Sequence, residues 1–425
     1  MPLTDQPRDW EQILFNRRML TCVFLGFTSG LPLYVLIQLI PAWLRTTGVD
    51  LSTIGLFSLI ALPYTWKFAW SPLLDRFALP GLGRRRGWML LTQIVLLCSI
   101  AALGSFNPEQ SLQMIIYVVI AITVSSASQD IAIDAYRREL LADDELGTGN
   151  AIHVNAYRIS SLVPGSLALI LADHMAWQQV FWVTAAFMLV GIGMTLVIRE
   201  VSDDAIAPHT LREAVVEPFR EFLLRNGLTR AMLVLLFMLL YKLGDNMAVA
   251  LETPFFIDQG FSLTEIGSVK KLSALWASIA GSIVGGVVML KLSINRALWL
   301  FGVVQILSIL GYAALALAGD DLLMLFVAVS FEYFGVGLGT VGLTAFIARQ
   351  TSLKFAATQF ALLSSLTAVP RTLANASTGF IIEAMGYFHF YLLCFALALP
   401  GMLLLLWVAP WRDQQSRNSG ISGCR

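Results

Sequence analysis

Two halves of the sequence correspond to each other at a constant offset of 212 residues. The stretch that begins at Val49 and ends at Gly55 is matched by the stretch from Phe261 to Gly267, and both are flanked by apolar segments of helix length. Three further identities fall at the same offset: Leu31 with Leu243, Gly48 with Gly260, and Arg137 with Arg349. A duplicated apolar sequence of this kind predicts two similar half-bundles of helices.

Apolar segments long enough to cross a bilayer recur through both halves. A bilayer core needs a helix of about 20 apolar residues, and twelve such segments are present. They run approximately over residues 19–43, 53–74, 88–106, 112–135, 150–172 and 177–198, and then over 231–251, 266–292, 297–318, 322–348, 358–382 and 390–409. Only 13% of residues are charged, against roughly 25% in soluble domains. We therefore predict an all-α membrane protein with twelve transmembrane helices in two pseudo-symmetric six-helix halves.

The basic residues are distributed unevenly over the predicted loops. With the amino terminus in the cytoplasm, 21 of the 28 lysines and arginines lie in cytoplasmic segments, and only Arg45 lies clearly in a loop on the opposite side. We therefore expect both termini in the cytoplasm. The predicted parts are a cytoplasmic segment (1–18), the first half (19–198), a cytoplasmic linker (199–230), the second half (231–410) and a disordered tail (411–425). Residues 211–217 of the linker suit either a short amphipathic surface helix or a plain connection.

Several classes of protein are disfavoured by composition. The formal net charge is zero, so no overall basic field argues for nucleic acid. The four cysteines have no metal-ligand spacing, and the four histidines are scattered. Because no nucleophile, metal or phosphate-loop motif is present either, we expect neither an enzyme nor a protein with a metal or another cofactor.

Charged residues inside the predicted spans are the strongest pointer to function. The set comprises the basic Lys67, Arg158, Lys242, Lys270, Lys271 and Arg371 and the acidic Asp130, Asp134, Asp245 and Glu332. Each costs about 2.5 to 3.5 kcal/mol at the centre of a membrane helix. Several together therefore need either mutual pairing or a cavity that holds water and substrate, and a transport pathway is the economical explanation.

Three of the carboxyl groups are candidates for proton coupling. Asp245 follows Lys242 by three residues near the middle of the seventh span, where it is either a protonatable group or half of a static ion pair. Glu332 lies in the middle of the tenth span, where burial either brings its pKa into a working range or keeps it permanently protonated. Asp130, deep in the fourth span, suits a proton relay or a structural pair.

Other polar groups suit an anionic, polar substrate. Arg158 and Arg371 occupy equivalent spans to within one residue of the offset, and a guanidinium group binds carboxylates through two hydrogen bonds. Their alternative role is to pair with Asp130 or Glu332. The remaining candidates for substrate contact are Gln129, Tyr157, Tyr241, Lys242 and Lys270. The aromatic rings serve equally well for packing, and Lys270 has the alternative of extending to the membrane interface.

A further set is expected to act in gating. Asp134 lies one helical turn below Asp130 and close to Arg137, which suits a gating or structural salt bridge. Residues 71–76 (SPLLDR) and 83–87 (GRRRG) resemble the loop motif of the major facilitator superfamily between spans two and three, where an acidic residue and a basic cluster latch the cytoplasmic faces. On that resemblance we assign Asp75, Arg76 and Arg84 to gating; a cluster that only sets topology is the alternative.

A narrower resemblance covers nearly all of the membrane region. The segments that carry it are GFTSGLP (26–32), KFAWSPLLDR (67–76), GRRRGW (83–88), SASQD (126–130), YKLGD (241–245) and ATQFALLS (357–364). Together they resemble the AmpG family of muropeptide permeases. The resemblance implies proton-driven import of N-acetylglucosaminyl-1,6-anhydro-N-acetylmuramic acid and its peptides across the bacterial inner membrane for cell-wall recycling, with a link to β-lactamase induction.

The resemblance leaves alternatives at the level of substrate. Related branches import siderophores, and the same scaffold also supports drug efflux antiport. The high fixed charge expected in the pathway disfavours a flexible multidrug site. The partners expected are an anhydromuropeptide, protons and the lipid bilayer, and we expect a monomer.

Overall fold

The computed structural model describes residues 16–67, 70–79, 82–141, 145–200, 217–351 and 356–411. This part of the chain contains ten helices that are long and apolar enough to cross a membrane. The second predicted span is present as a shorter apolar helix, Leu51–Trp66. The last two predicted spans lie within one helical element, α21 (Ala356–Val408), which is interrupted at Gly386. The prediction of an all-α, multi-pass membrane fold is confirmed.

Contacts divide the chain into two compact units. Unit 1 comprises residues 1–49 and 60–207, and unit 2 comprises residues 50–59 and 208–425. The division follows the predicted halves except that residues 50–59 group with the second. The elements of unit 1 are α2 (Arg17–Tyr34), η1 (Val35–Leu39), α3 (Ile40–Thr46), α5 (Leu62–Trp66), α6 (Ser71–Arg76), α7 (Arg84–Leu103), α8 (Pro108–Leu140), α9 (Leu146–Ser160), η4 (Val163–Leu167), α10 (Ala168–Ala172), α11 (Trp177–Ala186) and α12 (Met188–Val197).

Unit 2 contains the helices of the second half and one short helix from the first. Its elements are α4 (Leu51–Leu56), α13 (Glu217–Asn226), α14 (Leu228–Leu240), α15 (Leu243–Ala250), α16 (Glu252–Asp258), α17 (Leu263–Val269), η6 (Lys270–Ala274), α18 (Leu275–Lys291), α19 (Ile294–Ala318), α20 (Leu322–Gln350) and α21. The 3₁₀ segment η2 (Phe57–Ala61) lies at the boundary between the units. The segments η1, η4 and η6 are single π-helical turns within longer helices.

The duplicated motif produces the same local structure twice. Asp50 and Ser262 are equivalent at the 212-residue offset, and each caps the helix that follows by accepting a backbone N–H group at the third position of that helix. Gly48 and Gly260, two residues earlier, both have positive φ, of 86° and 100°. Only glycine adopts this conformation without a steric cost, so the shared glycine and cap fix where both helices begin.

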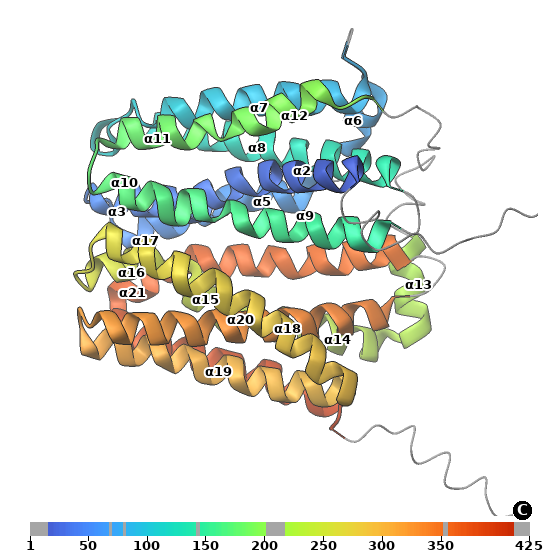
Figure 1. The fold of residues 1–425 in the computed structure, drawn as a ribbon. Coiled ribbons are helices and arrows are strands. Elements are labelled where there is room, and N and C mark those ends of the chain that lie inside the picture. The colour runs from blue at the N-terminus through green and yellow to red at the C-terminus, as the bar shows by residue number, and fades with distance from the viewer. Residues whose placement is uncertain are drawn as a thin grey trace, which may run out of the picture. The chain divides into compact units, whose positions relative to one another are not determined.

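Unit 1 is built around close contacts between its helices. Gly26 of α2 packs so closely on the backbone of His153 that an added Cβ atom would lie 2.3 Å from its carbonyl oxygen. Figure 1 shows α7 beside α12, and the two helices are in contact. Leu25, Met89 and Tyr136 form one buried cluster between α2, α7 and α8. The Tyr136 hydroxyl donates a hydrogen bond to the Arg199 carbonyl, 2.9 Å away, at the end of the first half.

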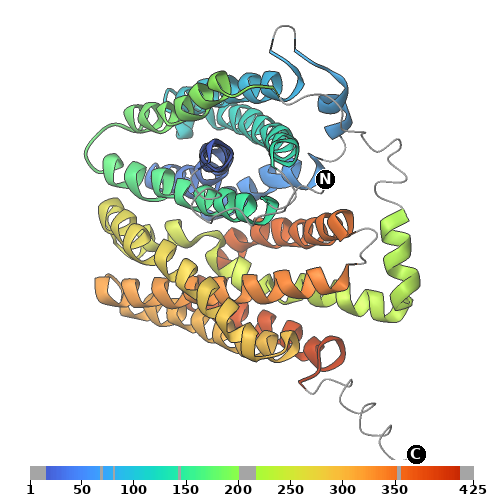
Figure 2. The ribbon, with the colours of Figure 1, turned by 45° about the vertical axis from the view of Figure 1, so that its right-hand side comes forward.

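Unit 2 includes a short helix in the predicted linker. Helix α13 runs across the ends of longer helices of this unit (Figure 2). The Gln359 amide on α21 donates a hydrogen bond to Glu221 of α13, and Arg225 of α13 donates one to the carbonyl oxygen of Gln350 at the end of α20. Phe222 of α13 is buried. The amphipathic segment predicted at residues 211–217 lies outside the described residues except for Glu217, and so do residues 412–425 of the predicted tail.

Candidate functional site

In unit 1, Asp130 lies at the meeting point of three elements. It is on α8, and its Oδ1 atom accepts a hydrogen bond from the Ser29 hydroxyl of α2 at 2.6 Å. The Lys67 ammonium group, just after α5, lies 3.9 Å from Oδ2. The Asp130 side chain is 15% exposed. The deep carboxylate predicted to relay protons therefore has a hydroxyl and a cation beside it, and both proposed roles remain compatible with its position.

The charges of unit 1 continue along α8 toward its end. Lys67 also lies 3.8 Å from Oδ2 of Asp134, and Arg137 donates a hydrogen bond to Oδ1 of Asp134 at 3.0 Å. The spacing of one turn between Asp130 and Asp134 places both carboxylates against the same lysine. The salt bridge predicted between Asp134 and Arg137 is thus present, while its role in gating stays a prediction. About half of the Asp134 side chain is exposed.

The predicted substrate contacts of unit 1 differ in exposure. Gln129 is completely buried, and neither atom of its amide group has a hydrogen-bond partner among the described residues. The ring of Tyr157 on α9 packs edge-on against the ring of Tyr34, with centroids 5.7 Å apart. Arg158 is half-buried and interacts electrostatically with Tyr34. Tyr157 and Arg158 therefore both lie near Tyr34, where α2 contacts α9.

In unit 2, a break between two helices positions the predicted ion pair. Helix α14 ends at Leu240 and α15 begins at Leu243, so Lys242 lies at the break with non-helical backbone angles. Its ammonium group contacts Oδ2 of Asp245 at 3.0 Å, and the two side chains are 14% and 6% exposed. The predicted contact is confirmed. Tyr241 is buried beside it, and its hydroxyl donates to the Leu298 carbonyl at 2.9 Å.

Glu332 of α20 is completely buried in the same unit. The Ser308 hydroxyl of α19 donates a hydrogen bond to its Oε2 atom at 2.7 Å. The Glu332 carboxyl group also lies within hydrogen-bond reach of the carboxyl group of Asp245. Two of the three carboxyl groups predicted to couple protons therefore contact each other, which the sequence did not reveal because they lie in spans seven and ten.

A second buried ion pair in unit 2 was missed. The Lys270 ammonium group lies 2.7 Å from Glu252 Oε1 and donates a hydrogen bond to the Thr253 hydroxyl at 2.7 Å. Tyr312 and Tyr333 donate hydrogen bonds to the Glu252 carboxylate at 3.1 and 2.7 Å. Lys270 is only 5% exposed, so the alternative that it extends to the membrane interface is wrong.

The sequence contains a pattern from which the ion pair between Glu252 and Lys270 could have been predicted. Glu252 and Lys270 lie at similar distances along the chain on the two sides of the turn at Gly260. A helical hairpin that turns there brings them to the same depth, and two opposite charges at one depth in an apolar environment pair with each other. The substrate contact assigned to Lys270 remains a prediction, and its ammonium group already has these two partners.

The predicted gate in the loop between spans two and three is only partly visible. The side chains of Asp75 and Arg76, and that of Arg371 on α21, lie outside the part of the chain whose side chains are described. Arg84 begins α7. The buried member of the basic cluster is Arg85 instead, which the sequence did not single out, and its guanidinium group contacts Glu139 of α8 at 3.0 Å.

The start of α7 is held by a residue from the end of the first half. The carboxylate of Glu200 accepts hydrogen bonds from the backbone N–H groups of Arg85 and Arg86, at 2.7 and 3.0 Å. A carboxylate is stabilised at this position because the first N–H groups of a helix have no partner within it. The guanidinium group of Arg86 in turn donates to the Thr195 carbonyl at 3.2 Å. The basic cluster thus ties the ends of α7, α8 and α12 together within unit 1.

Comparison with known proteins identifies the family. Residues 22–354 match the Major Facilitator Superfamily. The chain is 44% identical over 397 residues to the anhydromuropeptide permease of Escherichia coli K12, which covers 93% of this chain and 80% of that protein. The chain belongs to the AmpG family of the major facilitator superfamily. A putative transporter, AmpG 4, of Rickettsia felis is 30% identical over 93% of the chain and 98% of its own length.

Solved structures agree with the fold of the AmpG family member described here. The nucleoside transporter NupG matches with a TM-score of 0.74 at 10% identity, over 93% of this chain and 100% of that one. A transporter of the POT family in complex with 5-aminolevulinic acid matches with a TM-score of 0.72 at 13% identity, over 93% and 96%. At these identities the likeness concerns the fold alone.

Proposed function

We propose that this protein imports anhydromuropeptides, N-acetylglucosaminyl-1,6-anhydro-N-acetylmuramic acid and its peptides, by symport with protons. The observation that carries the proposal is the 44% identity to the anhydromuropeptide permease of Escherichia coli over 93% of the chain. Buried ionisable side chains inside membrane helices support it, because such groups are expensive in a bilayer and mark substrate and proton pathways. Loss of a permease of this type would interrupt cell-wall recycling and lower the induction of β-lactamase.

The proposed setting is the bacterial inner membrane. Both termini face the cytoplasm, which agrees with the concentration of arginine in the loops assigned to that side. The working form is a monomer. Each unit holds at least one acidic side chain beside a lysine, Asp130 beside Lys67 and Asp245 beside Lys242, so no second chain is needed to supply a charged partner.

The proposed cycle uses these groups in sequence. In the outward-open state a proton binds in the set Asp130, Asp245 and Glu332, and the anionic substrate follows. Arg158, Lys242 and Arg371 attract the carboxylates of the stem peptide. The two halves then rock and release both into the cytoplasm, driven by the different affinities of the two states. One charge that crosses 100 mV supplies about 2.3 kcal/mol, enough to drive accumulation.

Transport in liposomes tests the proposal. The purified protein is reconstituted, and uptake of labelled anhydromuropeptide is measured with and without an inward proton gradient. Wild type is expected to accumulate the label only with the gradient, and Asp245→Asn and Arg371→Ala are expected to abolish accumulation. Lys271→Gln is the matched control, because Lys271 is exposed and adjoins the buried Lys270, and it is expected to transport normally.

Other results of the transport experiment would indicate a different substrate or mechanism. Folded wild-type protein that does not take up anhydromuropeptide would contradict the substrate, and the same vesicles would then be tested with siderophores. Outward movement of a drug against the proton gradient would indicate an efflux antiporter. Uptake that does not respond to the gradient would retain the substrate and contradict proton coupling.

A further inference from the structure

Two carboxyl groups meet inside unit 2. Asp245 and Glu332 are 4% and 0% exposed, and their carboxyl groups lie within hydrogen-bond reach of each other. Each carboxyl group has one oxygen atom with a donor, because Lys242 contacts Oδ2 of Asp245 and Ser308 donates to Oε2 of Glu332. Oδ1 of Asp245 and Oε1 of Glu332 receive no N–H or O–H donor from the described residues. Two ionised carboxylates at this reach repel each other and leave both of these oxygens without a donor, whereas one proton on either group supplies a donor to the other.

The charge balance of the cluster fixes how many protons it holds. Lys242 carries one positive charge, so the cluster is neutral when the two carboxyl groups together hold one proton. With no proton the cluster is negative, and with two it is positive. A net charge is costly in a buried membrane environment. Among the described residues, the other titratable groups near the pair are Tyr241 beside Asp245, Tyr312 on α19, and Tyr391 and Cys394 on α21, and all four are neutral when protonated.

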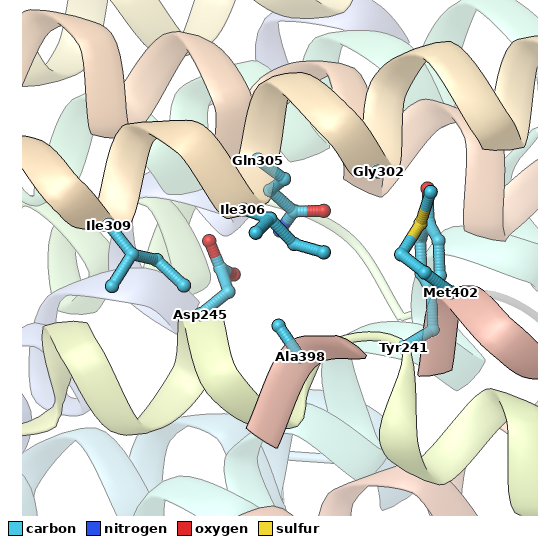
Figure 3. A pocket seen from close by; sticks show the side chains of 8 residues that line it. All are labelled: Tyr241, Asp245, Gly302, Gln305, Ile306, Ile309, Ala398 and Met402. Carbon is cyan, nitrogen blue, oxygen red and sulfur yellow. The ribbon is translucent and has the colours of Figure 1, made fainter. Parts of the chain in front are cut away.

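A small cavity lies beside the Asp245 side chain. The space has a volume of about 10 Å³, about the size of one water molecule, and is lined by Asp245, Gln305 of α19 and Met402 of α21, among others. Figure 3 shows the Asp245 carboxyl group and the Gln305 side chain at this space. Gln305 is 3% exposed, and neither atom of its amide group has a hydrogen-bond partner among the described residues. A buried water molecule needs two to four polar partners, and Gln305 and Asp245 supply them.

We propose that Asp245 and Glu332 bind a single proton between them, that this pair is the proton carrier of unit 2, and that water held by Gln305 delivers the proton to Asp245. The proposal rests on the proposed proton-driven import. It replaces two independent acids by one titrating unit, in which Lys242 sets the charge and Gln305 acts as a positioning residue. The competing arrangement is a Glu332 that stays protonated by itself, beside an Asp245 that only pairs with Lys242.

Infrared spectroscopy of purified protein in nanodiscs separates these arrangements without any substrate. A protonated carboxyl group has its own C=O band, which shifts in D₂O. In Asp245→Asn the pair is broken, and we expect Glu332 to ionise against Lys242 so that its band disappears at neutral pH. A band that survives in Asp245→Asn would overturn the shared proton. Asp130→Asn in unit 1 is the matched control and is expected to leave the band of the pair in place.

Transport supplies the second measurement. In Glu332→Gln the amide group can still donate to the Asp245 carboxylate and accept from Ser308, so we expect a folded protein that exchanges substrate in counterflow but is no longer stimulated by a proton gradient. Gradient-stimulated uptake by Glu332→Gln would overturn the proposal. Gln305→Leu is expected to keep the infrared band and counterflow and to slow gradient-driven uptake several-fold. If wild type transports no anhydromuropeptide, the proposed function fails, whereas the infrared result still decides whether the pair shares a proton.

Discussion

The buried lysine side chains of unit 2 are stabilised by oppositely charged and hydrogen-bonding groups beside them. In unit 2, Lys242 contacts Asp245, and Lys270 contacts Glu252 and Thr253. Each ammonium group lies within 3.0 Å of a carboxylate. An ion pair inside an apolar bundle offsets the cost of burial only when further hydrogen bonds complete it. Glu252 meets this condition through two tyrosine hydroxyls, which favours a structural role for that pair.

Removal of one partner should therefore destabilise unit 2. We predict that Lys270→Met lowers the free energy of unfolding by about 3 to 5 kcal/mol, because the Glu252 carboxylate is left buried without its cation. The double variant Lys270→Met with Glu252→Gln should recover most of this loss, since the glutamine oxygen accepts a hydrogen bond from one tyrosine hydroxyl and its NH₂ group donates one to the other. Thermal unfolding in detergent, followed by tryptophan fluorescence, measures both. A single variant as stable as wild type would contradict the structural role.

The cap of α4 should make stability depend on pH. The Ser52 hydroxyl, which donates a hydrogen bond to the Asp50 carboxylate, and then the Thr53 N–H group lower the pKa of Asp50 to about 2. Because the pKa is lower in the folded state, the ionised group stabilises the fold above the ordinary pKa of about 3.9. This contribution is lost as the pH falls toward about 2.

Asp50→Asn retains a capping side chain without the ionisable group. We predict that the advantage of wild type over this variant in unfolding temperature is constant above about pH 5 and shrinks below about pH 4. Thermal unfolding at a series of pH values in one detergent measures it. An advantage that grows in acid would show that the sign of the pKa shift is wrong.

At the scale of elements, glycines decide how closely helices approach. Gly281 of α18 faces the backbone of α20, where an added Cβ atom would lie 2.2 Å from the Phe334 carbonyl oxygen. Gly286 lies on the same helix, and an added Cβ atom there meets nothing within 4 Å. The two glycines look alike in the sequence, but only Gly281 is required by the packing of α18 on α20.

Alanine substitutions should show that Gly281 and Gly286 differ in their importance for helix packing. We predict that Gly281→Ala forces α18 away from α20 and lowers the unfolding temperature markedly, with lower yield of folded protein. Gly286→Ala should be neutral or stabilise by about 0.5 to 1 kcal/mol, because alanine favours the helix more than glycine. Size-exclusion profiles and thermal unfolding in the same detergent compare them. Equal behaviour of the two variants would refute the close contact.

At the scale of the whole molecule, the duplication sets the helices but not the charges. The position equivalent to Asp130 is Gly342, and the position equivalent to Asp245 is Leu33. In unit 1, Asp130 lies on α8. In unit 2, Asp245 lies on α15 and Glu332 lies on α20. The two halves thus share their backbone plan and differ in the positions of these carboxyl groups, as expected if proton binding and the contacts to a large asymmetric substrate are divided between them.

The predicted orientation can be checked on the same scale. Alkaline phosphatase is active only outside the cytoplasm, so fusions after Asn107 and after Gly319 are predicted to be active. Fusions after Leu292 and after the last residue are predicted to be inactive, because both termini and the basic loops should face the cytoplasm. The reverse pattern would show that the orientation inferred from arginine and lysine is wrong.

The sequence by itself determined the helical membrane fold, the recurrence of the motif at residues 49–55 and 261–267, and the contact between Lys242 and Asp245. These depend on the apolar length of each span, on local backbone chemistry and on residues one turn apart. Only the tertiary structure decided that Glu332 contacts Asp245, and that Lys270 is neutralised by Glu252. Both contacts join different spans, and their depth and facing depend on how helices bend and pack, which is determined by contacts such as that of Gly281 with Phe334.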